Sequence, residues 1–178
     1  MTEAHMTNPH TPTKKWSKEE IEDALIDFIE DSTTTWVSGD IAAWADWYAE
    51  DAVFRDLGMG YESGVELHGR TAIREQYIKN RDHFPGGQVQ YYPCPWYIID
   101  EDRGLVLMEW RCRMTDPGDG SLHEEPCYTR LIYGGDRQWS FEEDIYNPVR
   151  MGEMIERWLA IYVEHHPGPL PEKSSLAL

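Results

Sequence analysis

The chain has 178 residues, of which 40% are hydrophobic and 12% aromatic, a composition that suits one globular domain with a substantial core. Its 33 acidic residues outnumber the 16 basic ones and give a formal net charge of −17, which would repel a phosphate backbone. We therefore expect no nucleic-acid partner. No apolar run approaches the roughly 20 residues that cross a bilayer, and the N-terminus lacks the apolar core of a secretion signal. We therefore expect a soluble cytoplasmic protein without a membrane partner.

The two ends of the sequence differ in composition from its middle. Residues 1–15 carry Thr, Pro, Asn, His and Lys without an apolar period, and three prolines follow His166 before a Ser-rich end. Segments of this kind bury too little apolar surface to fold by themselves. The sequence therefore predicts a flexible N-terminal tail at 1–15, a single domain at 16–166 and a C-terminal tail at 167–178.

Helical periodicity opens the predicted domain. Ser17 begins a capping box, and apolar residues then recur on one helical face until Gly39. Ser32 is the one polar member of that face. Asp40 is placed to cap a short second helix, which is predicted to continue through Tyr48.

A strand and a third helix follow in the sequence. The stretch that ends at Asp56 predicts a strand, and it places this carboxylate between two helices. The third helix is predicted at about residues 70–83, where it presents Tyr77 on its apolar side, and Pro85 ends it.

The second half of the domain predicts a β-meander, because aromatic and β-branched runs are separated by short turn clusters. Four long antiparallel strands are expected, at about 88–99, 104–115, 121–133 and 137–146. Pro93 and Pro95 would place a bend or an edge in the first of them. A last helix, apolar on one side from Met151 to Tyr162, would close over the sheet or pack in a subunit contact.

Period-2 alternation sorts the polar side chains of these strands by face. On the second long strand Trp110 belongs to an apolar side, whereas Glu109 and Arg111 belong to a charged side. On the third strand Tyr128 and Arg130 share a face. The charged sides suit a solvated face or a subunit interface, and a pocket-facing Arg111 or Glu109 remains the alternative.

The fourth long strand is mixed on both faces. Glu142, Asp144 and Tyr146 lie on one face, and the residues between them lie on the other. A slip of one residue in the register would exchange the two sets.

The order of these elements resembles the nuclear transport factor 2-like superfamily, in its ketosteroid isomerase and SnoaL-like polyketide cyclase branch. The resemblance is carried by the Ala49–Phe54 strand and the Gly69–Arg74 helix start, and it covers about residues 17–147. It implies an α+β fold, a cone-shaped α+β barrel in which N-terminal helices pack on a curved, mainly antiparallel sheet with a C-terminal helix. It also implies a homodimer that forms through the sheet.

The same resemblance assigns expected roles to individual residues. Asp56 falls where the proton-shuttling aspartate of that branch sits, and Tyr48 and Tyr77 fall at tyrosines of a hydrogen-bond network. Tyr128 falls near the aspartic acid that donates to the substrate oxyanion. The sequence departs from the branch at this position and at Ser32, which replaces the principal oxyanion tyrosine. Steroid isomerisation by the family mechanism is therefore not expected.

A carboxylate in an apolar cleft loses hydration, which raises its pKa and strengthens it as a base, and a nearby phenol or guanidinium can stabilise developing negative charge. Ordinary structural roles are the alternatives: a turn or helix cap for Asp56, core packing for each tyrosine, and a surface loop for His68. The predicted catalytic residues are Asp56, Tyr128, Tyr48, Arg130 and Asp144. The predicted substrate-binding residues are Tyr77, Arg111, Trp110, Glu142, Tyr146, His68 and Trp36.

Neither a metal nor a cofactor is expected. The three cysteines, Cys94, Cys112 and Cys127, form no CxxC pair and have no histidine at ligand spacing. The aromatic content suits a hydrophobic hydroxylated aromatic substrate. The leading hypothesis is a cofactor-independent lyase or isomerase, in which proton transfer at Asp56 drives elimination of water or a small carbonyl fragment, or a double-bond shift. Some superfamily members release formaldehyde from lignin-derived diaryl diols. An epoxide hydrolase or hydratase, a polyketide cyclase, and a non-catalytic binding or dimerisation module are the alternatives.

Overall fold

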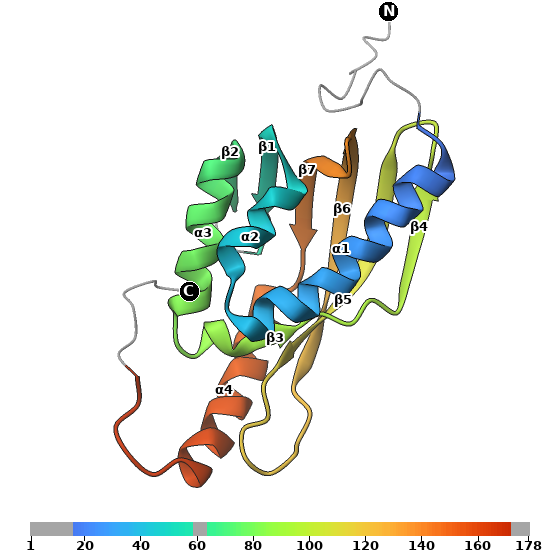
Figure 1. The fold of residues 1–178 in the computed structure, drawn as a ribbon. Helices are drawn as coiled ribbons and strands as arrows, with labels where there is room; N and C mark the ends of the chain where they lie inside the picture. Colours follow the sequence, from blue (N-terminus) through green and yellow to red (C-terminus); the bar gives the residue numbers. More distant parts are fainter. Residues whose placement is uncertain (1–15, 59–63, 172–178) are drawn as a thin grey trace, which may run out of the picture.

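The computed structural model describes residues 16–58 and 64–171, and it has helices packed on one seven-stranded sheet (Figure 1). The strand order is β2-β1-β7-β6-β5-β3, and β4 also pairs with β5. Only the β1–β7 pair is parallel among these described strands, and the other pairs are antiparallel. The predicted α+β class with a mainly antiparallel sheet is thus confirmed. The predicted tail at 1–15 and the end of the C-terminal tail lie outside the described residues, and the domain bounds stay a prediction.

The helices lie against one face of the sheet, which we call the inner face, and the opposite face is the outer face (Figure 1). In Figure 1, α1 crosses the inner side of the sheet, α2 and α3 lie toward β1 and β2, and α4 lies at the end near β3. The helical segments are α1 (Lys18–Ser38), α2 (Ile41–Trp44), the 3-10 turn η1 (Ala45–Trp47), α3 (Arg70–Asp82), the 3-10 turn η2 (Gly86–Gln88) and α4 (Pro148–His165). The strands are β1 (Tyr48–Asp56), β2 (Val65–His68), β3 (Val89–Tyr91), β4 (Trp96–Asp100), β5 (Leu105–Met114), β6 (Glu124–Gly135) and β7 (Gln138–Ile145).

The first helix begins and ends where the sequence predicted. The Ser17 side chain accepts a hydrogen bond from the Glu20 amide at 3.1 Å, and Gly39 ends α1 with a φ of 84°. The second helix is shorter than expected. Asp40 stands at its N-cap but makes no side-chain capping bond, and the chain tightens into η1. Tyr48 therefore begins β1 instead of ending a helix.

The predicted strand at 88–99 is two strands in the structure. Proline has no amide hydrogen for a sheet ladder, so Pro93 and Pro95 separate β3 from β4, and both strands pair with β5. The segment between β3 and β4 is still hydrogen-bonded to β5, because the Arg111 amide donates to the Pro93 carbonyl at 2.8 Å. The sequence also failed to predict β2, which pairs with the end of β1.

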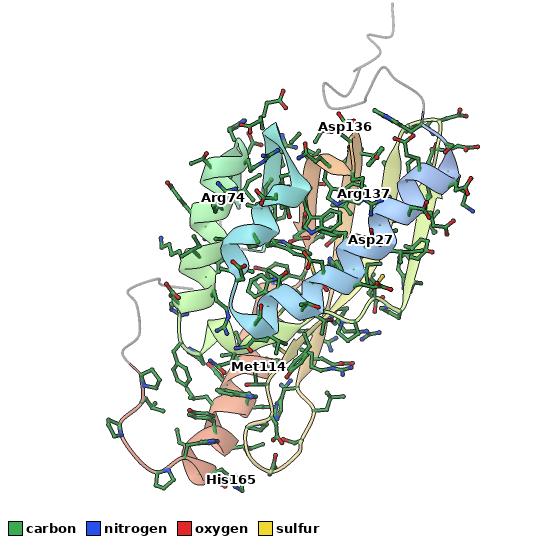
Figure 2. The ribbon with its side chains drawn as sticks, in the orientation of Figure 1. Asp27, Arg74, Met114, Asp136, Arg137 and His165 are labelled. Atoms are coloured by element: carbon green, nitrogen blue, oxygen red, sulfur yellow. The ribbon has the colours of Figure 1, made fainter. Side chains whose placement is uncertain are left out.

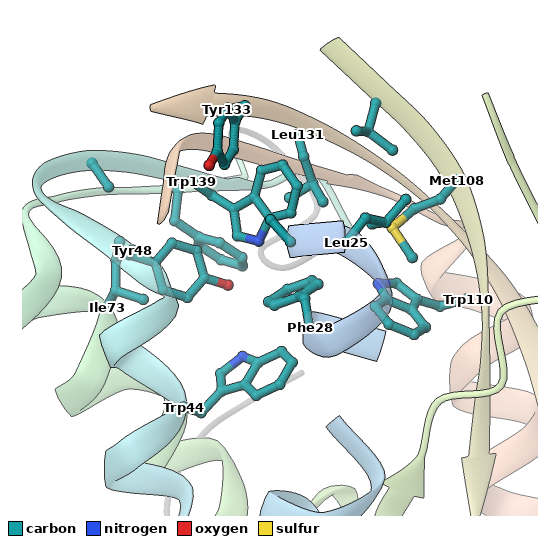
Figure 3. Close-up of a cluster of buried hydrophobic side chains, with 14 of the residues drawn as sticks. Leu25, Phe28, Trp44, Tyr48, Ile73, Met108, Trp110, Leu131, Tyr133 and Trp139 are labelled. Carbon is teal, nitrogen blue, oxygen red and sulfur yellow. The ribbon is translucent and has the colours of Figure 1, made fainter. Parts of the chain in front are cut away.

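The core fills the space between α1 and the sheet. Phe28 lies near its centre, with its ring stacked on the Trp44 ring at 4.5 Å and edge-on to the Trp139 ring at 5.6 Å between ring centres (Figure 3). Trp110 lies on the β5 side of the core. Full burial of one such side chain contributes about 1.5–3 kcal/mol. At the rim, Asp27 of α1 forms an ion pair with Arg137 of the β6–β7 turn, which ties the helix to the sheet (Figure 2).

Candidate active site

A cavity of about 280 Å³ lies between the helices and the inner face of the sheet. Its walls are mainly aromatic and aliphatic, with few polar groups, and α4 contributes one side of it. The aromatic lining residues are Phe28, Trp36, Trp44, Phe54, Tyr77, Tyr92, Trp110 and Tyr146. An apolar concavity with a few convergent polar groups is the usual form of a small-molecule site.

Three carboxyl groups enter the cavity from two adjacent strands. Asp56 ends β1 and lies opposite Asp144 of β7 in the parallel register, and Glu142 lies two residues before Asp144 on the same face. Neighbouring strands are about 4.8 Å apart, so the register brings these acids close together. Asp56 is 7% exposed and Glu142 is 3% exposed. Asp144 is half-buried. Acids that lie close together in a mainly apolar site are a common feature of catalytic sites.

Neutral donors hold the first pair of acids. The Gly58 amide donates to Asp56 Oδ1 at 2.9 Å, and the Tyr146 hydroxyl donates to Asp56 Oδ2 at 3.4 Å. The Thr129 hydroxyl donates to Asp144 Oδ1. Gly58 is required here because a Cβ at this position would lie 2.2 Å from the Tyr146 ring.

A second set of hydrogen bonds lies behind the wall of the cavity. The Tyr48 hydroxyl donates to Glu142 Oε2 at 2.5 Å, and it lies 2.7 Å from the Tyr77 hydroxyl of α3. Tyr48 is fully buried. The two tyrosines therefore fix the position of the Glu142 carboxyl without exposing it to water.

Burial changes the protonation of these groups. It raises the pKa of Glu142 well above the usual value, and the charge of Asp144 raises it further, while the Tyr48 hydrogen bond opposes the change. Burial also raises the pKa of Asp144, to about 7, against the effect of the Thr129 hydrogen bond. Burial keeps the pKa of the Tyr146 hydroxyl above its usual value, so it remains a donor. A carboxyl with a pKa near neutral can both accept and return a proton.

Comparison with known proteins identifies the family. Residues 29–135, more than half of the chain, match the family model of the SnoaL-like domain. The chain belongs to the SnoaL-like family. No curated protein is similar to it in sequence at a significant level.

Solved structures share the fold of this SnoaL-like domain. A candidate isomerase from Bacillus subtilis is 17% identical with a TM-score of 0.61, covering 78% of this chain and 94% of that one. An NTF2-like protein from Anabaena variabilis is 14% identical with a TM-score of 0.56, covering 76% and 96%. A candidate SnoaL-like polyketide cyclase from Shewanella putrefaciens is 14% identical with a TM-score of 0.54, covering 77% and 86%. They confirm the predicted nuclear transport factor 2-like fold, and the lignin-dimer subtype stays a prediction.

Most of the residues predicted for the SnoaL-like site meet at the cavity. Tyr48 does not line the cavity itself, and its hydroxyl is linked to it by the hydrogen bonds to Glu142 and Tyr77. The predicted residues that line it are Asp56, Asp144, Glu142, Tyr146, Tyr77, Trp110 and Trp36.

Three predicted residues lie on the outer face of the sheet instead. Tyr128 is 42% exposed, Arg130 pairs with Glu143, and Arg111 pairs with Glu109. Successive side chains of a strand point to opposite faces of the sheet. Cys127, next to Tyr128, and Trp110 and Cys112, on either side of Arg111, line the cavity, so Tyr128 and Arg111 point outward. The predicted roles of Tyr128 as donor and of Arg130 or Arg111 as clamp do not fit these positions.

His68 also lies away from the cavity. It ends β2, is exposed, and its ring Nε2 lies 2.8 Å from the Glu66 carboxylate. His68 is therefore a surface residue, as the alternative interpretation expected, and it does not contact the cavity.

Sequence reasoning missed several lining residues. Cys112 shares the apolar side of β5 with Trp110, and this alternation could have identified it. Ser32 was recognised as the polar member of the first helical face, and it too lines the cavity. His83 caps the C-terminus of α3, and Gly152 lies on α4, where no local pattern indicates a pocket.

Residues 16–58 and 64–171 contain neither a metal-binding cluster nor a membrane-spanning helix. No group of three His, Cys, Asp or Glu side chains in these ranges is arranged to hold a metal ion. None of the helices in them combines the length and the apolar character of a membrane span.

Proposed function

We propose that this SnoaL-like domain is a cofactor-independent enzyme of isomerase, cyclase or lyase type, which transfers a proton through the carboxyl groups of its cavity. The observation that carries the proposal is the parallel pair Asp56 and Asp144, held by neutral donors in an apolar enclosure. Asp144, with its pKa near 7, removes a proton from the substrate or returns one. The Tyr146 hydroxyl stays protonated, and it would donate to a substrate oxygen by exchanging its long 3.4 Å hydrogen bond to Asp56 for one to the substrate.

The size and lining of the cavity support a substrate of one or two aromatic rings with hydroxyl groups. A cavity of about 280 Å³ with a mainly apolar lining lies near the lower end of the range of small-molecule sites, about 300–1,000 Å³. It suits an aromatic compound with hydroxyl groups, such as a diaryl diol. Elimination of water or formaldehyde from such a compound is the reaction we propose. A cytoplasmic location is part of the same proposal.

The epoxide hydrolase alternative has less support. It requires a water held between Asp144 and an arginine, and the described residues that line the cavity include no arginine. A purely structural module would not need acids with raised pKa values in an open cavity, so the enzyme is the better interpretation.

Turnover of hydroxylated aromatic compounds, with the product mass recorded, tests the proposal. Asp144→Asn and Asp56→Asn should each lower kcat by about 100-fold or more, the usual effect of losing a general acid or base. Glu143→Gln is the matched control, because its side chain lies on the opposite face of the same strand. Loss of water or formaldehyde identifies a lyase, and an unchanged mass identifies an isomerase or cyclase. Equal turnover by the wild type and both aspartate variants would refute the site.

We also propose that the protein is a homodimer that forms through the outer face of the sheet. This face exposes apolar side chains around its ion pairs, and Ile98 is 60% exposed there. The exposed apolar residues of the outer face are Trp96, Ile98, Leu107, Tyr128 and Ile145. Ile98→Glu should convert the dimer to a monomer in analytical ultracentrifugation, whereas the control Leu122→Glu, in an exposed loop, should not. A monomeric wild type would contradict this proposal.

A further inference from the structure

Acidic side chains outnumber basic ones in the described lining of the cavity. The described lining contains three carboxyl groups and one histidine, His83, but no lysine or arginine. Glu142 and Asp144 are hydrogen-bonded by hydroxyl groups, Tyr48 and Thr129, and these partners carry no charge. Above pH 7, where Asp144 is ionised, its carboxylate gives the cavity a negative potential that no lysine or arginine of the described lining offsets. A bound cation would also favour the ionised form of Glu142.

The arginines of the sheet do not reach the cavity. All four arginines in the described strands lie on the outer face, where each pairs with a carboxylate. They are Arg55, Arg111, Arg113 and Arg130. Their positive charge is thus neutralised on the far side of the sheet from the cavity.

Aromatic rings surround the same acids. Eight aromatic side chains line the cavity, and they come from α1, α2, α3, three strands or strand ends, and the segment after β3. The face of an aromatic ring attracts a cation, by about 2 kcal/mol or more where water is excluded. Tyr146 joins both features, because its ring lines the cavity while its hydroxyl donates to Asp56.

We propose that the cavity selects an organic cation, an aromatic compound whose protonated or quaternary amine lies between the carboxyl groups and the ring faces. This inference rests on the proposed function, since it names the substrate class of the same site. The cation would give Asp144 and Glu142 a positively charged partner, whereas their hydrogen-bond partners Tyr48 and Thr129 are uncharged. An anionic compound of the same shape would meet repulsion from the same groups.

Shape alone would not distinguish a cation from a neutral compound. Both would bury the same apolar area, so a neutral isostere would gain the same hydrophobic contribution. Only the cation gains the interaction with the carboxylates and the ring faces. The ratio of the two dissociation constants therefore measures the proposed selectivity directly.

The experiment compares three ligands of matched shape by isothermal titration calorimetry at pH 8. They are 4-(trimethylammonio)benzyl alcohol, its neutral carbon isostere 4-tert-butylbenzyl alcohol, and the anionic 4-(hydroxymethyl)benzenesulfonate. We expect the wild type to bind the cation at least 10-fold more tightly than the neutral compound, and the anion more weakly than either. Equal or tighter binding of the neutral compound would overturn the inference.

Variants locate the source of the selectivity. Asp144→Asn and Glu142→Gln should each lower the preference for the cation several-fold, while Glu143→Gln, on the outer face, should leave it unchanged. An unchanged preference in both inner-face variants would also overturn the inference. The turnover assay is separate from the binding assay. Turnover without a preference for the cation would support the proposed function and overturn this inference. A preference for the cation without turnover would support cation binding and contradict the proposed function.

Discussion

Replacement of Asp144 by Asn should stabilise the protein at high pH, although it removes a proposed catalytic group. The pKa of Asp144 rises from its usual 3.8 to about 7 on folding, so the folded protein binds its proton more tightly than the unfolded chain. A carboxyl of this kind contributes stability below pH 3.8, and the contribution is lost as the pH rises through 7. At about 1.4 kcal/mol for each pH unit of difference, the loss is about 4 kcal/mol. Asn carries no proton to lose, and its side-chain oxygen can still accept from Thr129.

Urea denaturation from pH 4 to pH 8 measures this effect. The wild type should lose stability across this range, and Asp144→Asn should lose less, so that the variant is more stable by up to about 4 kcal/mol at pH 8 and differs little at pH 4. Asp46→Asn is the control, because Asp46 is exposed in its pair with Arg74, and its effect should stay within about 0.5 kcal/mol. If the two curves of wild type and Asp144→Asn were parallel, the carboxyl would not titrate as the burial implies, and the reasoning on its acid–base role would fail.

Three further changes test neighbouring parts of the site. Tyr48→Phe leaves the buried Glu142 carboxyl without its donor and should destabilise the protein by about 1–3 kcal/mol in urea; no effect would show that Glu142 finds another partner. Gly58→Ala should destabilise it by about 1–3 kcal/mol in thermal unfolding, because the added Cβ would lie 2.2 Å from the Tyr146 ring, and a neutral result would mean that the ring moves freely. Gly152→Ala should stabilise α4 by about 0.5–1 kcal/mol in the same assay, since no atom lies within 4 Å of the added Cβ; a loss of stability would reveal a contact that α4 makes in solution.

The fold followed from local signals where these were strong. The Ser17 cap, the Gly39 stop and the meander each depend on residues close in sequence, and the structure has them where they were expected. The errors have local causes too. Four residues are too few for an alternating pattern to reveal β2. Pro93 and Pro95 were expected to place a bend or an edge in one strand, whereas they divide it into β3 and β4.

The inner and outer faces of the sheet were harder to predict than its strands. Alternation correctly grouped Glu142, Asp144 and Tyr146, but both faces of β7 carry acids, so the sequence could not say which set enters a cavity. On β6 the error was larger. Tyr128 and Arg130 suggested chemistry by residue type, whereas the inward positions are held by Cys127 and Thr129, which did not.

The distribution of charge between the two faces explains why the site has an acidic character. Glu143 on the outer face lies 3.0 Å from Arg130, and both Arg130 and Arg55 lie over the ring of Phe141. On the inner face its neighbours Glu142 and Asp144 are hydrogen-bonded by uncharged groups, the hydroxyls of Tyr48 and Thr129 and the thiol of Cys127. A shift of the pairing by one residue would bring the arginines inward and make an anion site from the same strands. The raised pKa values of Glu142 and Asp144 therefore depend on the register of the strands. They lower the stability of the folded protein at high pH, and they lie where the proposed proton transfer would use them.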